Sequence, residues 1–311
     1  MTKPFTFGVQ VGGTRDGADF RAHARKIEDL GYETFYLPDH FVDTAMAPMV
    51  GLAVAAEATT TLRVCALVLD NDYKHPAIVA KETATIDVLS GGRAELGIGA
   101  GWMKVDYDAL GIPYDSAGTR IARLEEACAV IKGAWADGAH SFAGKHYTIS
   151  EYDAIPKPTQ RPGPPILIGG GGPKLLRLAG READIVGINP NLRAGAVTND
   201  AATDSVAENI DRKVGWIREG AGARFDDLTL QIRYFFANVT DDRQGLAEAM
   251  APAFGLSPQD ALDAGISLVG TVEEICDILV ERRERWGVSS IVVGDDAFEA
   301  FAPVVGRLAA S

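Results

Sequence analysis

The chain has 311 residues, 47% of them hydrophobic, enough for one large or two small domains around a sizeable core. Its net charge of −13 argues against nucleic acid and anionic membranes as partners, because both attract basic proteins. A cytoplasmic protein without disulfides, zinc or a membrane span is predicted, since the three cysteines (Cys65, Cys128, Cys276) form no CxxC pair and neither a signal-peptide core nor a run of ~18 apolar residues is present.

The first half of the chain repeats a strand–helix unit four times. In each unit a short apolar run of strand length precedes a segment with helical spacing of apolar residues. The predicted strands are Phe5–Val11, Thr34–Phe41, Leu62–Leu69 and Arg93–Gly99. The predicted helices are Asp19–Gly31, Met46–Thr60, Pro76–Leu89 and Ile121–Trp135.

After an irregular stretch, His140–Pro165, the alternation resumes. Within that stretch, Ser141–Ile149 is predicted as a surface hairpin turning at Ala143-Gly144, and the Pro-rich end as a tether. Further strands are predicted at Ile166–Ile168, Asp184–Ile188, Leu228–Val239 and Ser290–Gly294. Helices are predicted at Pro173–Arg181, from Ser205 (capping box with Glu208), within Asp241–Gly265, from Thr271 (capping box with Glu274) and at Phe298–Ala310.

Eight strands that alternate with helices predict a parallel sheet covered by helices. Eight such units close into a (β/α)8 TIM barrel, here one domain over 1–311 with insertions near 140–165 and 189–204, the latter a lid or a tether. A doubly wound open sheet is the alternative. Its dinucleotide-binding form is disfavoured because no G-x-G-x-x-G follows the first strand. In a barrel the active site lies at the carboxyl ends of the strands.

The second predicted strand ends in Pro38 and is followed by Asp39 and His40, a carboxylic acid beside an imidazole. At the end of a buried strand these two groups would lie next to any ligand above the barrel, where His40 could handle a proton. The alternative is structural: Asp39 caps the next element and His40 hydrogen-bonds to it. The dipeptide alone supports both interpretations equally.

Four consecutive glycines, Gly169–Gly172, separate a strand from a helix. Their exposed N–H groups and the positive end of the helix are suited to a phosphate, and Lys174 and Arg177 on that helix favour an anion further. The alternative is a tight turn. Leu67–Asp70 is an apolar strand end that could support a flat ring or belong to the core, and Trp102 could line a pocket or pack at the rim.

A metal site is not predicted. Of the five histidines, only His40 follows a strand end, and the first strand ends in Val9-Gln10-Val11 rather than in a His-x-His pair. A G-x-S-x-G nucleophile motif is also missing from the sequence.

Three stretches together resemble the luciferase-like monooxygenase superfamily, and more narrowly its branch dependent on coenzyme F420, a deazaflavin. They are LPDHF (37–41), YKHPAIVAKETATIDVLSGGRAELGIGAGW (73–102) and PILIGGGGPKLLRLAGREAD (165–184). The resemblance covers the whole chain in order and spacing. It implies an (α/β)8 barrel with insertions, a homodimer, and an oxidoreductase that transfers a hydride between the deazaflavin and a small organic substrate.

The resemblance also implies roles for individual residues. His40 would be the proton-handling residue beside the ring, with Asp39 orienting it or holding it charged. Leu67 and Val68 would form a bulge, commonly with a non-proline cis peptide, that presses against the ring. The remaining expected cofactor contacts are Asp70, Ala100, Gly101, Gly170, Gly171 and Gly172.

The chain departs from the sugar-phosphate dehydrogenases of that branch. Trp102 stands where they have a Glu, and Val42, Asp43 and Thr44 stand where they have a Trp. The last strand ends in Asp295-Asp296, which predicts an acidic substrate pocket lined by Trp102 and Asp295 and a neutral or cationic substrate without phosphate. Two alternatives remain: an FMN-dependent two-component monooxygenase, or a non-catalytic protein that binds a deazaflavin or flavin.

Overall fold

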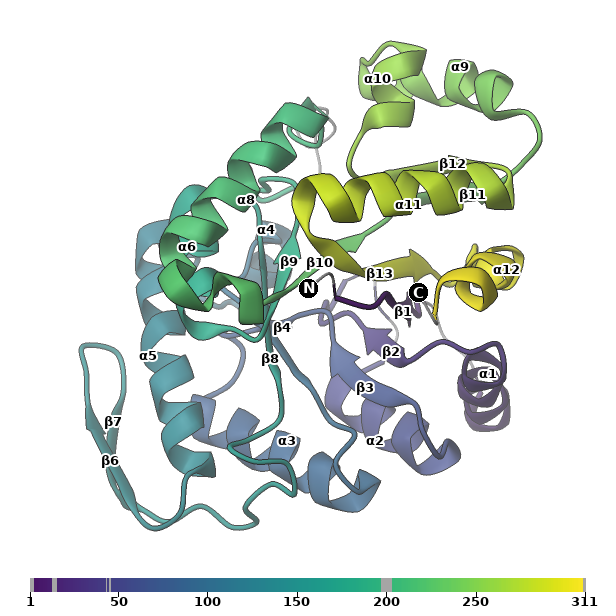
Figure 1. Cartoon of the computed structure of the whole chain (residues 1–311). Helices are drawn as coiled ribbons and strands as arrows, with labels where there is room; N and C mark the ends of the chain where they lie inside the picture. Colours follow the sequence, from purple (N-terminus) through teal and green to yellow (C-terminus); the bar gives the residue numbers. More distant parts are fainter. Residues whose placement is uncertain (1–2, 13–15, 43, 45, 197–202, 310–311) are drawn as a thin grey trace.

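The computed structural model describes residues 3–12, 16–42, 44, 46–196 and 203–309. Within them, nine strands form one parallel sheet in the order β3-β2-β1-β13-β10-β9-β8-β5-β4, rolled into a nearly closed barrel (Figure 1). The strands are β1 (Thr6–Gln10), β2 (Thr34–Leu37), β3 (Arg63–Ala66), β4 (Leu69–Asp70), β5 (Leu96–Gly99), β8 (Ile166–Gly170), β9 (Ile185–Ile188), β10 (Thr229–Arg233) and β13 (Val288–Gly294).

The two strands at the ends of that order, β3 and β4, come from the single predicted strand Leu62–Leu69. Leu67 and Val68 interrupt it, and the peptide bond between them is cis. A parallel bridge between Val64 and Ala94 brings β3 alongside the segment that leads into β5. The eight predicted strand positions are therefore all occupied, and the TIM barrel is confirmed.

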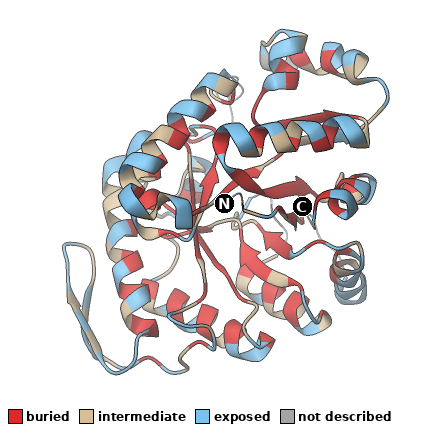
Figure 2. Ribbon diagram, in the orientation of Figure 1, coloured by how far each residue is buried: buried red, intermediate tan, exposed pale blue. Residues whose placement is uncertain are grey.

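The major helices surround the barrel with one face toward the strands (Figures 1 and 2). They are α1 (Gly17–Asp29), α2 (Pro48–Ala58), α3 (Pro76–Ser90), α5 (Ala117–Trp135), α6 (Pro173–Glu182), α8 (Ala207–Ala221), α11 (Val272–Trp286) and α12 (Phe298–Leu308). Shorter helices are α4 (Lys104–Leu110), α9 (Arg243–Phe254), α10 (Pro258–Asp263) and the 3-10 helix η1 (Gly222–Asp227).

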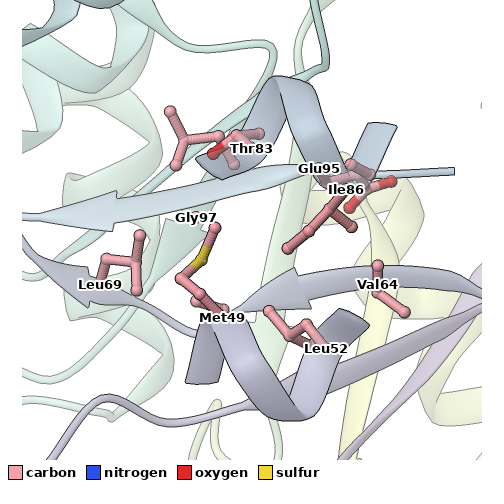
Figure 3. A pocket seen from close by; sticks show the side chains of 11 residues that line it. Met49, Leu52, Val64, Leu69, Thr83, Ile86, Glu95 and Gly97 are labelled. Carbon is pink, nitrogen blue, oxygen red and sulfur yellow. The ribbon is translucent and has the colours of Figure 1, made fainter. Parts of the chain in front are cut away.

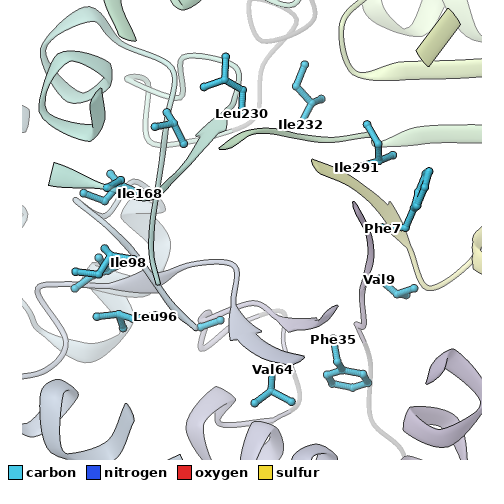
Figure 4. Packing of buried hydrophobic residues seen from close by; sticks show 14 of the residues in the cluster. Phe7, Val9, Phe35, Val64, Leu96, Ile98, Ile168, Leu230, Ile232 and Ile291 are labelled. Carbon is cyan, nitrogen blue, oxygen red and sulfur yellow. The ribbon is translucent and has the colours of Figure 1, made fainter. Parts of the chain in front are cut away.

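Alternation along the strands divides the core into two clusters. Side chains such as Phe7, Val9 and Ile232 point away from the barrel centre and pack against the helices (Figure 4). A smaller cluster of inward-facing side chains, including Tyr36 and Val292, fills the barrel itself. The interior is therefore a packed core, and the active site of such a barrel lies above it, at the carboxyl ends of the strands.

The segments outside the barrel differ from the predictions in two places. The capping box at Ser205 is wrong: α8 begins at Ala207 after Val206, which makes no side-chain cap. The box at Thr271 is confirmed. The predicted strand Leu228–Val239 is two strands, because only β10 joins the barrel while β11 (Phe236–Val239) pairs with β12 (Ser267–Gly270).

The two predicted insertions have different outcomes. The hairpin is confirmed as β6 (His140–Ala143) paired antiparallel with β7 (Thr148–Tyr152), and its turn is closed by the Gly144 N–H donating to the Tyr147 carbonyl at 2.9 Å. In the predicted loop 189–204, residues 197–202 lie outside the described residues. Asn191 in that loop donates its N–H to Asp204 at 2.7 Å.

Candidate active site

His40, which follows β2, is held by a carboxylate that the sequence analysis did not select. Its Nδ1 lies 2.8 Å from Oδ2 of Asp106, a fully buried residue on α4. The other oxygen, Oδ1, accepts the backbone N–H groups of Phe41 and Val42, each at 3.0 Å. With the carboxylate as acceptor, Nδ1 carries the proton, and Nε2 is left for other partners. Trp102 lies edge-on to the imidazole, with centroids 5.4 Å apart.

Among the described residues, no hydrogen bond joins Asp39 to the imidazole that we expected it to orient. Its Oδ2 accepts the backbone N–H of Asp70 at 3.1 Å, so it links β2 to β4 rather than capping a helix. Burial raises the pKa of Asp39. The two predicted site residues Asp39 and His40 therefore lie at the same end of the barrel but form hydrogen bonds to different partners.

Asp70 is the centre of a buried polar network. Its Oδ1 accepts the Tyr107 hydroxyl at 3.0 Å and the Asp72 backbone N–H at 2.9 Å. Burial raises the pKa of Asp70 to about 7. Arg123 pairs with Asp72 at 2.7 Å and supplies the compensating positive charge on the outer side. Burial therefore favours the protonated form of Asp70 compared with a carboxyl in water.

Gly101 lets Tyr107 approach Asp70 from α4. Its φ of +74° lies in the left-handed region, and an added Cβ would stand 1.9 Å from the Tyr107 hydroxyl and 2.4 Å from Asp70 Oδ2. Only glycine fits there without displacing the network. The adjacent Ala100 carbonyl accepts Arg120 Nε at 3.0 Å.

The cis peptide between Leu67 and Val68 lies among glycines. A Cβ added at Gly99 would stand 2.9 Å from Val68 Cγ2, and a Cβ added at Gly169 would stand 3.5 Å from Val68 Cγ1. Val68 thus occupies space that neighbouring strands leave by lacking side chains. The Leu67 carbonyl accepts Gln10 Nε2 at 3.1 Å, which anchors the bulge to β1. Leu67 and Val68 are half-buried apolar residues that pack against the inward-facing cluster, and their support of a flat ring stays a prediction.

The glycine loop lies between β8 and α6. An added Cβ at Gly171 would stand 2.4 Å from the Pro190 carbonyl oxygen, so the backbones of two loops are closely apposed there. Gly172 is the N-cap of α6 and provides no capping side chain, which leaves N–H groups of the first turn available to an anion. Lys174 instead contacts the Gly118 carbonyl at 3.3 Å and Arg177 pairs with Glu219 at 2.7 Å, so neither side chain reinforces the loop as expected.

The mouth is not uniformly acidic. Oδ1 of Asp295 lies 2.5 Å from Nε2 of His23 on α1, so this carboxylate is paired with a side chain of that helix. Arg233, the last residue of β10, contributes a cation whose Nε donates to Gln10 at 2.7 Å. The role of Asp295 in a substrate pocket stays a prediction, and Arg233 adds a cation that the sequence did not predict there.

Three residues of this site were not predicted from the sequence: Asp106, Tyr107 and Arg233. The segment Val105–Leu110 followed by Gly111 carries a helix-stop signal that could have revealed α4. Arg233 is two residues from Gln231, a spacing that places both on one face of β10.

The sequence model for the luciferase-like monooxygenase family matches residues 2–290. The chain belongs to this family. Among curated relatives, it is 35% identical over 160 residues to the FMNH(2)-dependent dimethylsulfone monooxygenase of Pseudomonas putida, a match that covers 51% of this chain and 44% of that protein. It is 31% identical over 195 residues to the F420-dependent glucose-6-phosphate dehydrogenase of Microbacterium testaceum (strain StLB037), covering 59% and 56%. The matches thus span about half the length of these relatives.

Solved structures of luciferase-like proteins share the fold. The coenzyme F420-dependent tetrahydromethanopterin reductase from Methanopyrus kandleri superposes with a TM-score of 0.78 at 22% identity, covering 98% of each chain. A second structure, an F420-dependent secondary alcohol dehydrogenase in complex with an F420-acetone adduct, gives a TM-score of 0.77 at 18% identity and again covers 98% of each chain. At these identities the likeness establishes the barrel and not the chemistry.

Two cavities lie away from the mouth of this luciferase-like barrel. One, between α2, α3 and the strands β3 and β5, measures about 10 Å³, roughly the space of one water molecule (Figure 3). The other, about 420 Å³, lies near α8, α10 and α11 and is lined by charged side chains of both signs. Within the described ranges, neither a three-residue cluster of metal-binding side chains nor a helix able to cross a membrane is found.

Proposed function

We propose that this chain is an oxidoreductase that uses coenzyme F420 to transfer a hydride to or from a small, non-phosphorylated organic substrate. The observation that carries the proposal is the pair His40–Asp106 at the same barrel end as the apolar surface of Val68. Relatives and structural neighbours named for coenzyme F420 support this choice of cofactor.

The residues at the mouth fit a cofactor that has a flat ring and a phosphate. The ring would rest on Leu67 and Val68, whose position is fixed because the Val68 side chain fills the space that Gly99 and Gly169 leave. The phosphate would lie at Gly170–Gly172, where α6 begins without a capping side chain. In this proposal Asp39, Asp70, Ala100 and Gly101 border the ring.

When bound, a deazaflavin supplies a ring carbon that takes or gives a hydride. His40 would hold or release one proton at Nε2, because Asp106 engages Nδ1 and keeps the imidazole in one orientation. Trp102, edge-on to His40, would form a wall that helps to exclude water. Asp39 would act by tying β2 to β4 through the Asp70 N–H.

An FMN-dependent monooxygenase of the same family is the second candidate. The similarity to the Pseudomonas putida enzyme, 35% identity over 160 residues, favours it. Such an enzyme would receive reduced flavin from a partner and consume oxygen. A non-catalytic flavin- or deazaflavin-binding protein would bind the cofactor without turnover.

Fluorescence titration of the purified protein with coenzyme F420 and, separately, with FMN tests the proposal. We expect micromolar binding of coenzyme F420 and no comparable binding of FMN. A His40→Ala variant serves as the control and should bind the deazaflavin nearly as well. Preference for FMN would assign the oxygen-using function, and binding of neither compound would refute both candidates.

A further inference from the structure

Arg233 lies on the inner face of the barrel, one layer above its filled interior. On β10, Leu230 and Ile232 point outward into the main core (Figure 4). Gln231 points inward, where its Nε2 donates to the Tyr36 hydroxyl at 2.9 Å. Two residues further along the strand, Arg233 has the same inward direction and stands at the carboxyl end.

The guanidinium is anchored from one side by Gln10 of β1. Nε of Arg233 donates to Gln10 Oε1 at 2.7 Å, and Gln10 Nε2 donates to the Leu67 carbonyl at 3.1 Å. Because an arginine can only donate, this contact fixes which way the Gln10 amide faces. The chain of bonds therefore connects Arg233 to the cis-peptide bulge at Leu67-Val68.

The strand β13 lies between β10 and β1 and leaves room for the contact between Arg233 and Gln10. Gln10 is paired with Gly294 in the register of β1 and β13, and Arg233 is paired with Val292. An added Cβ at Gly294 would stand 3.3 Å from Arg233 Nη2 and 2.4 Å from Asp296 Oδ1. The absence of a side chain at Gly294 thus allows the guanidinium to lie across β13.

The terminal nitrogens of Arg233 retain donors for a ligand. Nη1 makes one long contact, 3.4 Å, to the Tyr234 carbonyl, and in the described part of the chain no acceptor bonds to Nη2. The Phe235 ring lies 4.0 Å from the guanidinium carbon and covers one of its faces. Burial lowers the pKa of Arg233 to about 10, opposed by the nearby carboxylate of Asp296, so the group stays charged at neutral pH.

We propose that Arg233, anchored by Gln10, binds a carboxylate group of the substrate at the barrel mouth. This inference rests on the proposed function and names its substrate class as small organic monocarboxylates. A planar guanidinium with free terminal donors matches the two oxygens of a carboxylate. A single cation beside Asp296 suits one negative charge better than the two of a phosphate. The anchor to Leu67 places this group beside the surface proposed for the ring.

The test compares benzoate with benzamide, a matched pair that differs in charge. Ligand-observed NMR titrations of the wild-type protein, with and without coenzyme F420, measure both dissociation constants. We expect benzoate to bind about 10- to 100-fold more tightly than benzamide, the scale of a charge-assisted hydrogen bond. Arg233→Gln should abolish this preference while the dissociation constant of coenzyme F420 stays within about threefold, because the proposed phosphate site lies elsewhere.

Arg161→Gln is the matched control, because Arg161 lies in the segment before β8, at the other end of the barrel. It should keep the benzoate preference. Asp296→Asn removes the competing carboxylate and should strengthen benzoate binding, a gain that loss of folding cannot mimic. An unchanged preference in Arg233→Gln, or equal loss in both arginine variants, would overturn the inference.

The two proposals can fail separately. If coenzyme F420 does not bind but the benzoate preference depends on Arg233, the proposed cofactor is wrong and the carboxylate site remains. If coenzyme F420 binds and the wild-type protein does not distinguish benzoate from benzamide, the cofactor proposal remains and the substrate class is wrong.

Discussion

The two halves of the barrel mouth differ in the charged and polar groups that they carry. The ends of β2, β4 and β5 carry Asp39, Asp70 and, on the following helix α4, Asp106, which is bonded to His40. The ends of β8 and β10 instead present glycines, an uncapped helix and Arg233, although Asp295 and Asp296 follow the neighbouring strand β13. Carboxylates repel an anion, whereas backbone N–H groups and a guanidinium attract it. In the proposed function, proton handling and anion binding would therefore lie in different parts of the mouth.

The largest effect on this comparison is expected from His40→Ala. Removing a general acid–base group usually lowers turnover by ~10²–10⁴-fold, so kcat should fall on that scale. Cofactor affinity should change little, because the phosphate is proposed to bind at the glycine loop in the other half. Steady-state kinetics and a cofactor titration check both parts. Full activity in the variant would remove His40 from the mechanism.

Asp106→Ala should also impair the first half, through position rather than chemistry. The imidazole and the N–H groups of Phe41 and Val42 lose their acceptor. We expect kcat to fall on the order of 10²-fold and the free energy of unfolding to fall by about 1–3 kcal/mol. Asp106→Asn, which keeps an acceptor oxygen for the N–H groups, should recover most of the stability. Wild-type kcat in Asp106→Ala would contradict this positioning role.

Gly171→Ala probes the second half. Its Cβ would stand 2.4 Å from the Pro190 carbonyl oxygen, so the loop must move. We expect cofactor binding to weaken about tenfold, which is the scale of one lost hydrogen bond. The position of His40 in the other half should not change. Gly215→Ala on α8 is the control, because nothing lies within 4 Å of its Cβ. That change should leave cofactor affinity unaltered and add about 0.5–1 kcal/mol of stability. Equal cofactor affinity in both variants would argue against the glycine loop as the phosphate site.

The smallest effect is a pH dependence in the first half. The pKa of Asp70 is raised from 3.8 to about 7 in the folded protein by burial. Between these values the folded state holds a proton that the unfolded chain has released, so stability falls as pH rises through this window. Asp70→Asn stays neutral and should show a shallower fall in melting temperature from pH 4 to 7. Parallel curves for the two proteins would show that Asp70 titrates normally.

Local signals predicted most of the barrel because apolar spacing and helix-stop residues act over short distances. The helix ended by Gly91 and the capping box of Thr271 and Glu274 follow from neighbouring residues alone. The box predicted at Ser205 is wrong because α8 begins at Ala207, with Val206 rather than Ser205 as its N-cap. The break between β10 and β11 depends on a second sheet that pairing with β12 creates.

The site, like the fold, has features that local sequence predicts and contacts that it does not. The position of His40, the Leu67–Asp70 strand end and the glycines at the carboxyl ends of strands was predictable, because each follows a predicted strand of a parallel barrel. Which of these groups contact each other depends on the three-dimensional arrangement of the strands and loops. Asp106 reaches His40 from 66 residues away along the chain. Arg233 reaches Gln10 from 223 residues away. Such contacts form only when the barrel closes. They join residues that are far apart along the chain, so no local sequence pattern predicts them.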